Sequence, residues 1–275
     1  MLGRRGVRAL SWNLFHGRDA PPNRSLRTRR SLVLRIAERD ATHVQVNRSL
    51  LEQFATVLDT LAWEVAMLQE APPRWLGPLC RRLGADGALA LTARNLVPAA
   101  QRLAARANPD LVGSWEGGSN QLLVRPPWRI AEVRRLTLVR RPERRRLLWA
   151  RLSAADGRAL CVGNVHLSVG RPFAAAHEAA FAAARSVEWA GAAPLVFGGD
   201  LNLAPCSSPT IFAELEERFG LAPSTAPDAI DHILARGLEQ IEAPRRLDPR
   251  ERELPAARGL ALRLSDHAPV VGRWR

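Results

Sequence analysis

The sequence contains neither lysine nor tyrosine, so all 40 of its basic residues are arginines. With 27 acidic residues they give a formal net charge of +13 at neutral pH. A surplus of positive charge attracts polyanions such as nucleic acids. A coding bias toward arginine and alanine would produce the same surplus, since alanine is abundant too. The net charge alone therefore leaves both explanations open.

Cysteines and long apolar segments are scarce as well. The three cysteines, Cys80, Cys161 and Cys206, are widely spaced and odd in number, which argues against a disulfide framework and a cysteine-based zinc site. Such usage is typical of the reducing cytoplasm. No run approaches the roughly 18 apolar residues of a membrane span, and the first residues lack the apolar segment of a signal peptide. We therefore expect a cytoplasmic monomer without a membrane span.

Several common catalytic and binding motifs are missing. The phosphate-binding loops GxGxxG and GxxxxGKS or GxxxxGKT do not occur. His177 and Glu178 begin like the HExxH motif of zinc proteases, but Phe181 stands where the second histidine would be. The remaining composition, 47% hydrophobic and 24% charged, is that of an ordinary folded chain.

Helical and strand-like patterns alternate along the chain, and no repeat or linker divides it. The predicted strands are 7–14, 64–69, 120–124, 128–139, 145–152, 158–166, 194–197, 230–234 and 268–274. The predicted helices are 48–61, 72–83, 96–107, 173–190 and one that starts at 208–209 and ends before 220. This alternation predicts a single α/β domain over 1–275. Two sheets packed between outer helices would fit it.

Polar, chemically capable residues follow many of these predicted strands. In open α/β sheets such strand ends gather around a ligand crevice. The motifs and their polar residues are SWNLFHG with Asn13 and His16, LQE with Glu70, GNVHLS with Asn164 and His166, GGDLN with Asp200 and Asn202, IDHIL with Asp231 and His232, and SDHAPV with Asp266 and His267.

The side chains in these motifs suit a hard metal ion. Glu70, Asp200 and Asp266 offer carboxylate oxygens, while Asn13 and Asn202 offer amide oxygens or N–H donors. Mg²⁺ prefers oxygen ligands and often shares its shell with a phosphate, and Mn²⁺ accepts similar ligands. Zinc fits less well, because no cysteine and only scattered histidines are present.

Taken in order, the motifs resemble the endonuclease/exonuclease/phosphatase superfamily. That group includes deoxyribonuclease I-like nucleases, apurinic endonucleases, inositol-polyphosphate 5-phosphatases and bacterial sphingomyelinases. The motifs extend over 11–271, nearly the whole chain. The resemblance implies a four-layer α/β sandwich, with two packed mixed β-sheets flanked by helices, and Mg²⁺-dependent phosphoester hydrolysis.

The resemblance also implies roles for individual residues near the metal. Glu70 corresponds to the principal metal ligand, and Asn13 and Asp266 to further ligands, direct or through water. Asp200 corresponds to the residue that orients or deprotonates the attacking water. Asn202 corresponds to a phosphate or water contact.

Other matching positions would contact the substrate. His267, supported by Asp231, corresponds to the imidazole that neutralises the scissile phosphate, since a carboxylate partner stabilises an imidazolium. His166 corresponds to a second histidine that hydrogen-bonds the phosphate or protonates the leaving oxygen. For a mid-chain phosphate contact, the motif GGSNQLLVR offers Asn120 and Arg125.

Several alternatives remain open at this stage. Nucleic acid is the leading substrate, and a small or lipid-headgroup phosphoester of the inositol phosphate kind is the alternative. A non-catalytic binding module with the same fold is the third alternative.

Individual residues also have alternative roles. His16 is either a metal ligand or a hydrogen-bonding residue of a loop, and we expect His232 to have a packing role. Three arginine clusters are either solvated faces or phosphate contacts: Arg24/Arg27/Arg29/Arg30, Arg140/Arg141/Arg144/Arg145/Arg146 and Arg245/Arg246/Arg250/Arg252. Trp75, Trp115 and Trp128 could stack on bases, although core burial is the simpler expectation.

Overall fold

Two β-sheets form the centre of the molecule in the computed structural model, which describes residues 6–92, 98–107, 117–141 and 143–275. The first sheet has the strand order β12-β15-β1-β4-β6-β5, in which only β1 and β4 are parallel. Its strands are β1 (Val7–Asn13), β4 (Val65–Ala71), β5 (Asp86–Leu91), β6 (Ser119–Val124), β12 (Gln240–Arg246) and β15 (Val270–Trp274).

The second sheet has the order β11-β10-β9-β8-β7, with β9 and β10 parallel and the other pairs antiparallel. Its strands are β7 (Trp128–Val139), β8 (Arg145–Ala154), β9 (Ala159–His166), β10 (Leu195–Asp200) and β11 (Asp231–Arg236). Both sheets are therefore mixed, as predicted.

The sheets pack face to face and bury an apolar layer between them. Val65, Met67 and Leu122 of the first sheet belong to one buried cluster with Leu148 and Val162 of the second. These positions recur at every second residue along their strands, because successive side chains point to opposite faces of a sheet.

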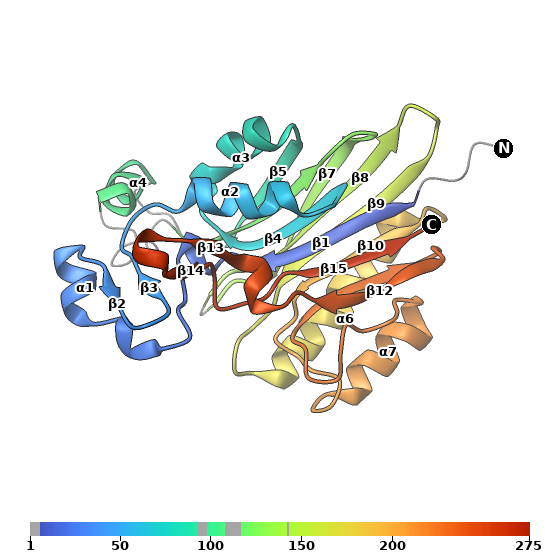
Figure 1. The fold of residues 1–275 in the computed structure, drawn as a ribbon. Coiled ribbons are helices and arrows are strands. Elements are labelled where there is room, and N and C mark those ends of the chain that lie inside the picture. The colour runs from blue at the N-terminus through green and yellow to red at the C-terminus, as the bar shows by residue number, and fades with distance from the viewer. Residues whose placement is uncertain (1–5, 93–97, 108–116, 142) are drawn as a thin grey trace.

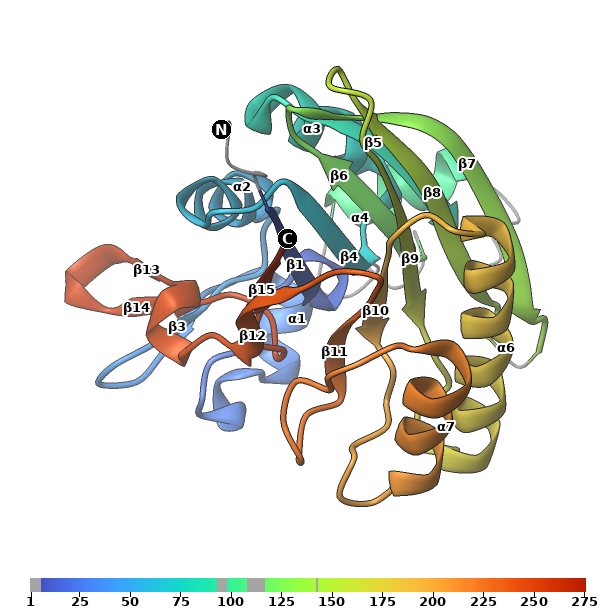
Figure 2. The ribbon, with the colours of Figure 1, turned by 90° about the vertical axis from the view of Figure 1, so that its right-hand side faces the viewer.

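Helices cover the two outer faces. In Figure 1, α2 (Leu51–Thr60) and α3 (Leu76–Leu83) lie over the first sheet. In Figure 2, α6 (Pro172–Ala190) and α7 (Pro209–Phe219) lie over the second. The four-layer α/β sandwich predicted from the sequence is therefore confirmed.

Shorter elements gather at one end of the sandwich (Figure 1). They are α1 (Arg29–Leu34), β2 (Glu38–Arg39), β3 (Val44–Gln45), α4 (Pro98–Ala107), β13 (Glu253–Pro255) and β14 (Ala261–Arg263). The described residues also form five short 3₁₀ helices: η1 (Phe15–Gly17), η2 (Arg24–Leu26), η3 (Pro73–Trp75), η4 (Pro249–Arg252) and η5 (Ala257–Gly259).

Most predicted elements are present within a few residues of their expected bounds. Gly84 and Gly220 end α3 and α7 in the left-handed conformation, at φ of 62° and 67°. The sequence reasoning missed β5, β12, α1 and the four shortest strands.

Trp75 and Trp128 are buried in the core rather than exposed for stacking, and Trp115 lies outside the described residues. In the part of the chain that the structure describes, no helix is long and apolar enough to cross a membrane.

Candidate active site

The strand register brings polar residues of both sheets to one end of the sandwich. Asn13 lies beside Gln69 in the parallel pair β1–β4, so Glu70 is the next residue at the same edge. In the second sheet Asp200 lies between His166 of β9 and Asp231 of β11. The Asn13 Nδ2 donates to Asp200 Oδ2 at 2.9 Å, and this hydrogen bond joins the two halves of the candidate site.

Two glycines allow the backbone to pack closely beneath Asp200. A Cβ on Gly198 would lie 2.0 Å from the carbonyl oxygen of His232, and one on Gly199 would lie 2.0 Å from that of Val165. Gly199 also has φ of +127°, which side chains rarely allow. Larger residues in place of Gly198 or Gly199 would therefore push the neighbouring strands apart. The two glycines allow the close strand packing that positions Asp200.

An imidazole and a carboxylate of the site form a close pair. His267 Nδ1 lies 2.7 Å from Asp231 Oδ2. The Ser265 hydroxyl accepts from the backbone N–H of His267 at 3.1 Å and donates to the Asn13 carbonyl at 2.6 Å. The Trp12 indole N–H donates to the His267 carbonyl at 3.0 Å. The loop that carries His267 is thus attached to β1 of the first sheet.

The negative charge of Asp231 raises the pKa of His267 and also that of Asp200. Burial alone would lower the pKa of His267, but the hydrogen bond and negative charge of Asp231, with the charges of Asp200 and Asp266, raise it to about 10. Burial, and then the charge of Asp231, raise the pKa of Asp200 to about 7. His267 is therefore a cation at neutral pH, and Asp200 can gain or lose a proton there.

The second histidine has the opposite electrostatic environment. His166 Nδ1 lies 3.2 Å from the guanidinium Nη1 of Arg145. Because a guanidinium only donates, Nδ1 must accept and Nε2 carries the hydrogen. That Nε2 lies 3.5 Å from Asp200 Oδ2 and 3.9 Å from Glu70 Oε1. Burial, and then the charge of Arg145, hold the pKa of His166 well below 6.5, so the imidazole is neutral.

Glu70 faces a further histidine. His16 Nε2 lies 3.2 Å from Glu70 Oε2. Burial, and then the charge of Arg18, lower the pKa of His16 to about 4. Burial, and then the charge of Asp266, raise the pKa of Glu70. His16 is therefore a neutral partner of Glu70, and the two carboxylates of Glu70 and Asp266 repel each other.

The backbone around the site is unusual. The non-glycine residues Phe15, His16, Glu70, Asn202 and Ser265 all have φ between 47° and 56°. Such left-handed residues are uncommon, and they concentrate at functional sites where the surrounding structure holds them. The fold thus accepts local strain where these side chains meet.

The remaining predicted residues differ in how closely they join this cluster. Asn202 donates from its backbone N–H to Asp200 Oδ1 at 3.1 Å and from its side chain to the Leu167 carbonyl at 3.1 Å. Asn120 lies in β6, opposite the irregularity of β4 that carries Glu70, and donates to the Arg146 carbonyl at 2.8 Å. The side chain of Asp266 is exposed to solvent.

Arg125 does not join the cluster, which corrects its selection as a phosphate contact. It follows β6 at the end of the sheet away from Glu70, where its backbone N–H donates to the Glu64 carbonyl at 2.8 Å. Its guanidinium pairs with Asp59 at 3.0 Å and lies 4.0 Å from the ring centre of Trp63. Asn120 and Arg125 flank one strand, so only one of the two can reach the site.

Sequence reasoning missed two contributors. Arg145 was only one member of an arginine-rich segment, and nothing in that run distinguishes the residue that contacts His166. Gln69, directly before Glu70, donates to the Asn164 side chain of the other sheet at 2.8 Å. By contrast His232 packs as expected, since its ring nitrogens contact the Leu203 carbonyl and the Thr225 N–H, at 3.0 and 3.2 Å.

The donor set fits a divalent cation on the Glu70 side of the cluster. A cation there would offset the repulsion between Glu70 and Asp266. Buried oxygens without a hydrogen-bond partner among the described residues include Asn120 Oδ1 and Asp231 Oδ1. Ligand atoms of Asp200, Asp231 and His267 also lie within 4.8 Å of one another, and the contact of 2.7 Å between His267 Nδ1 and Asp231 Oδ2 accounts for part of this closeness. We therefore explain that second group as an ion-pair network.

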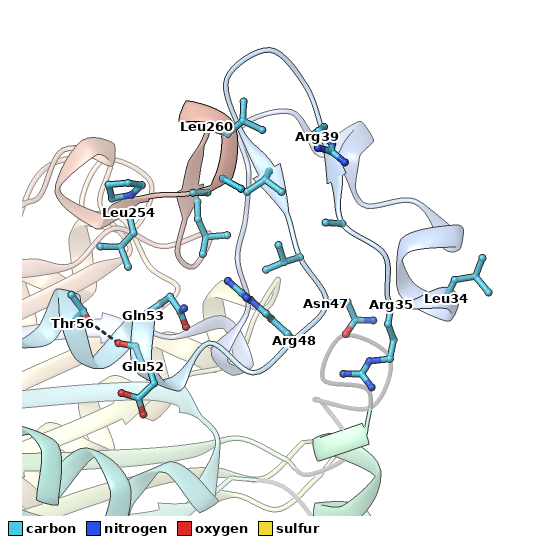
Figure 3. Close-up of a pocket in the computed structure, with 17 residues that line it drawn as sticks. Leu34, Arg35, Arg39, Asn47, Arg48, Glu52, Gln53, Thr56, Leu254 and Leu260 are labelled. Carbon is cyan, nitrogen blue, oxygen red and sulfur yellow. Dashed lines mark hydrogen bonds between the residues drawn. The ribbon is translucent and has the colours of Figure 1, made fainter.

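A separate hollow of about 1010 Å³ contains none of the predicted site residues. It lies between the β2–β3 segment, α2 and the β13–β14 hairpin, and Figure 3 shows its lining. Arg35, Arg39 and Arg48 share that lining with apolar residues such as Leu254 and Leu260. The candidate active site is thus a polar surface at the strand ends rather than this hollow.

A four-layer sandwich with carboxylates, amides and imidazoles at the strand ends is the arrangement that the resemblance of the motifs implied. The model of the endonuclease/exonuclease/phosphatase family matches residues 10–267, and the chain belongs to this family. Endonucleases, exonucleases and phosphatases all hydrolyse phosphoesters, so at the level of its family the protein is a phosphoester hydrolase. Comparison with curated proteins gave no match.

Solved structures with this fold cover nearly the whole chain. A Bacteroides thetaiotaomicron protein of the same family is 16% identical, with a TM-score of 0.65, over 98% of this chain and 97% of that one. A mannosyl-6-phosphatase of the same organism is 15% identical, with a TM-score of 0.65, over 98% and 99%. The human Nocturnin catalytic domain with bound sulfate is 14% identical, with a TM-score of 0.64, over 98% and 94%. At these identities the likeness concerns the fold.

Proposed function

We propose that the protein is a Mg²⁺-dependent phosphoester hydrolase, for which Mn²⁺ can substitute, and that it acts on nucleic acid phosphodiesters. The observation that carries this proposal is the meeting of Glu70 and Asn13 from one sheet with His166, Asp200 and Asp231 from the other. Family membership supports phosphoester hydrolysis, and the oxygen-rich donor set supports a hard divalent cation.

The proposed cation site uses Glu70, with Asp266 and Asn13 directly or through water. A bound Mg²⁺ would supply positive charge that offsets the negative charge of the phosphate oxygens. Glu70 suits this role because burial, and then the charge of Asp266, raise its pKa, and a bound cation would offset both effects.

Asp200 is the proposed acceptor of the proton from the attacking water. Its pKa of about 7 means that the carboxylate can take up a proton near neutral pH. The Asn13 side chain and the Asn202 backbone N–H each occupy one of its oxygens, at 2.9 and 3.1 Å. These bonds hold the carboxylate in one orientation, and the amide of Asn202 is a further proposed contact of the water or a phosphate oxygen.

The two imidazoles have different proposed tasks. The protonated His267 binds and neutralises a phosphate oxygen, because Asp231 keeps it charged. The neutral His166 offers its Nε2–H as a hydrogen-bond donor to the phosphate or the leaving oxygen. Asn120 is a further proposed phosphate contact through its amide.

Arginines on either side of the site support a polyanionic substrate. On one side, Arg145 contacts His166. On the other, the guanidinium of Arg27 lies 4.9 Å from the ring centre of Phe15, beside His16. Asp266 shares a hollow of about 600 Å³ with Arg24 and Arg27. Positive charge around the reacting centre favours a nucleic acid chain over an isolated phosphate.

A substrate panel with a chelation control tests the proposal. Plasmid DNA, abasic duplex, single-stranded RNA, bis-p-nitrophenyl phosphate and inositol phosphates are each incubated with protein and Mg²⁺. We expect hydrolysis of the nucleic acids and of bis-p-nitrophenyl phosphate, and its loss after dialysis against EDTA. Full activity in excess EDTA would exclude the metal, and hydrolysis of inositol phosphates alone would point to a small-molecule phosphatase. No hydrolysis at all, with no Mg²⁺ binding in a titration, would indicate a non-catalytic module.

Cellular location and assembly belong to the same proposal. We propose that the protein is a cytoplasmic monomer of one domain. Cys80, Cys161 and Cys206 are all free thiols in the structure, as a reducing compartment would allow. Fractionation of cells and light scattering of the purified protein test the two statements.

A further inference from the structure

Arginines surround a small hollow at the turn between β7 and β8. Its volume is about 400 Å³, and its lining consists of Thr137, Arg140, Arg141, Arg144 and Arg146. Guanidinium groups bind phosphate through paired N–H donors and retain their charge at any physiological pH. A space of this size with this lining is chemically suited to a phosphate group.

The hollow lies directly beside the candidate active site. Arg145 stands between two lining residues in sequence, and its guanidinium contacts His166 Nδ1 at 3.2 Å. The backbone carbonyl of Arg146 accepts from the Asn120 side chain at 2.8 Å. Arg144 and Arg146 line the hollow and flank Arg145 in the chain, and consecutive Cα atoms are only about 3.8 Å apart. A group bound in the hollow would therefore lie close to His166.

One lining residue has an unsatisfied donor. The Nε of Arg146 is buried and lacks a hydrogen-bond partner among the described residues. Buried donors are nearly always hydrogen-bonded in folded proteins. The nearby carboxylate of Glu143 is engaged by Arg145 at 2.6 Å, so an anion entering the hollow would supply an acceptor for Arg146.

We propose that this hollow binds a second phosphate group of the substrate, next to the one that is hydrolysed. This inference rests on the proposed phosphoesterase function and specifies its substrate class: molecules with at least two phosphate groups a short distance apart. A nucleic acid strand and a small bisphosphorylated molecule share this chemistry. A substrate with one isolated phosphate would gain nothing from the hollow.

Two pairs of chromogenic probes test the inference. One pair is thymidine 3′-(p-nitrophenyl phosphate) with and without a 5′-phosphate. The other is thymidine 5′-(p-nitrophenyl phosphate) with and without a 3′-phosphate. In at least one pair, we expect the second phosphate to raise kcat/KM by tenfold or more, mainly through KM. Equal kcat/KM within both pairs would overturn the inference.

Charge-neutral variants connect the effect to the hollow. Arg140→Gln/Arg141→Gln changes two exposed residues, and we expect it to remove most of the advantage of the second phosphate. Hydrolysis of the singly phosphorylated probes should stay within twofold of wild type. The matched control Arg185→Gln/Arg218→Gln removes the same charge from α6 and α7 and should leave the advantage intact. If both double variants lost the advantage of the second phosphate equally, net charge alone would explain that advantage. This result would overturn the inference.

A binding measurement separates this inference from the proposed function. Thymidine 3′,5′-bisphosphate is titrated into the protein in EDTA and the heat is recorded, with an oligonucleotide of ten thymidines as the second ligand. We expect Arg140→Gln/Arg141→Gln and Arg146→Gln each to weaken binding at least fivefold. If no probe is hydrolysed but this weakening is seen, the function proposal fails while the phosphate site stands. Unchanged affinity in both variants would reject the phosphate site.

Discussion

Two imidazoles of the candidate site sit within reach of the same carboxylate but differ in protonation. His267 and His166 both approach Asp200 Oδ2, at 3.9 and 3.5 Å. The first also pairs with Asp231, which favours the charged ring, whereas the second contacts Arg145, which favours the neutral ring. One site can therefore contain a cationic and a neutral imidazole at the same pH.

The charge of His267 should depend on Asp231. We expect Asp231→Asn to lower the pKa of His267 from about 10 toward the ordinary value of about 6.5, as followed by NMR titration of the metal-free protein. A pKa raised in the folded state contributes stability below about pH 6.5 that is lost as the pH rises through about 10. The stability difference between wild type and Asp231→Asn should therefore shrink toward pH 10.

A second histidine–carboxylate pair provides the control for that titration. His43 Nε2 lies 3.1 Å from Glu253 Oε1, outside the candidate site. Glu253→Gln should leave the titration of His267 unchanged. A His267 pKa near 10 in Asp231→Asn would contradict our account of the pair.

Glu70 and Asp200 should be indispensable for hydrolysis. We expect Glu70→Ala and Asp200→Asn each to reduce kcat/KM at least about 100-fold, because each loses a cation ligand or a water-orienting group. Circular dichroism should show a folded protein in both cases. Glu253→Ala, which removes a paired carboxylate elsewhere, should retain most of the activity. Near-normal hydrolysis by either folded site variant would remove that residue from the mechanism.

The sequence predicted where several candidate site residues would lie, because each stands at or near the end of a predicted strand, and the structure brings them together at one end of the sandwich. Asn13, Glu70, His166 and Asp200 were predictable because a buried strand rarely ends on such a group without a purpose. Arg125 and Arg145 were not distinguishable, since both are arginines beside predicted strands. Which of them reaches His166 depends on the direction of each strand within its sheet, and that is fixed by tertiary pairing.

At the scale of elements, β10 illustrates how a backbone requirement can determine sequence. Gly199 stands between the strands that carry His166 and Asp231, in a conformation that few other residues adopt. The same close packing that excludes a side chain there positions Asp200 one residue later.

This requirement predicts a large loss of stability on adding one methyl group. Gly199→Ala should lower the free energy of unfolding by roughly 2 kcal/mol or more, because its Cβ meets the Val165 carbonyl and its φ is strained. Gly157→Ala is the matched control, since Gly157 has φ of +83° with nothing within 4 Å of the added Cβ. It should cost only about 1 kcal/mol, the backbone strain of a left-handed residue without a clash. Urea denaturation measures both, and equal losses would contradict the steric argument.

The strands that sequence reasoning missed are edge strands or very short ones. β5 and β12 form the two edges of the first sheet. The β5 sequence DGALAL contains few residues that favour strands, and β12 contains Pro244. Such segments become strands because a neighbouring strand offers hydrogen bonds, which local composition does not reveal. The central strands were predictable because burial on both faces requires apolar residues.

At the scale of the whole molecule, the net charge is +13. We expect the arginines near the site, rather than the net charge as a whole, to determine the affinity for nucleic acid. We expect the affinity for a fluorescent thymidine oligonucleotide, measured by anisotropy in EDTA, to fall linearly on a plot of log affinity against log salt. Arg24→Gln/Arg27→Gln should reduce that slope by roughly 0.7 for each phosphate that the variant no longer neutralises.

The comparison variant for this measurement is Arg185→Gln/Arg218→Gln. It has the same net charge but changes helices that cover the outer face of the second sheet. Its salt slope should equal that of wild type. Equal slopes in all three proteins would mean that Arg24 and Arg27 belong to a solvated face, and would move the substrate toward small phosphoesters.

Asn164 lies within the layer between the two sheets, and its contacts limit how far one sheet can slide over the other. Its side chain accepts from Gln69 Nε2 at 2.8 Å and donates to the carbonyls of Leu68 and Gln121 at 3.1 and 2.8 Å. Apolar contacts around it have no preferred direction, so they would permit small lateral displacements of one sheet. The three hydrogen bonds admit only one alignment. Because each sheet holds half of the site, this amide helps to keep the two sheets in the alignment in which Asn13 meets Asp200.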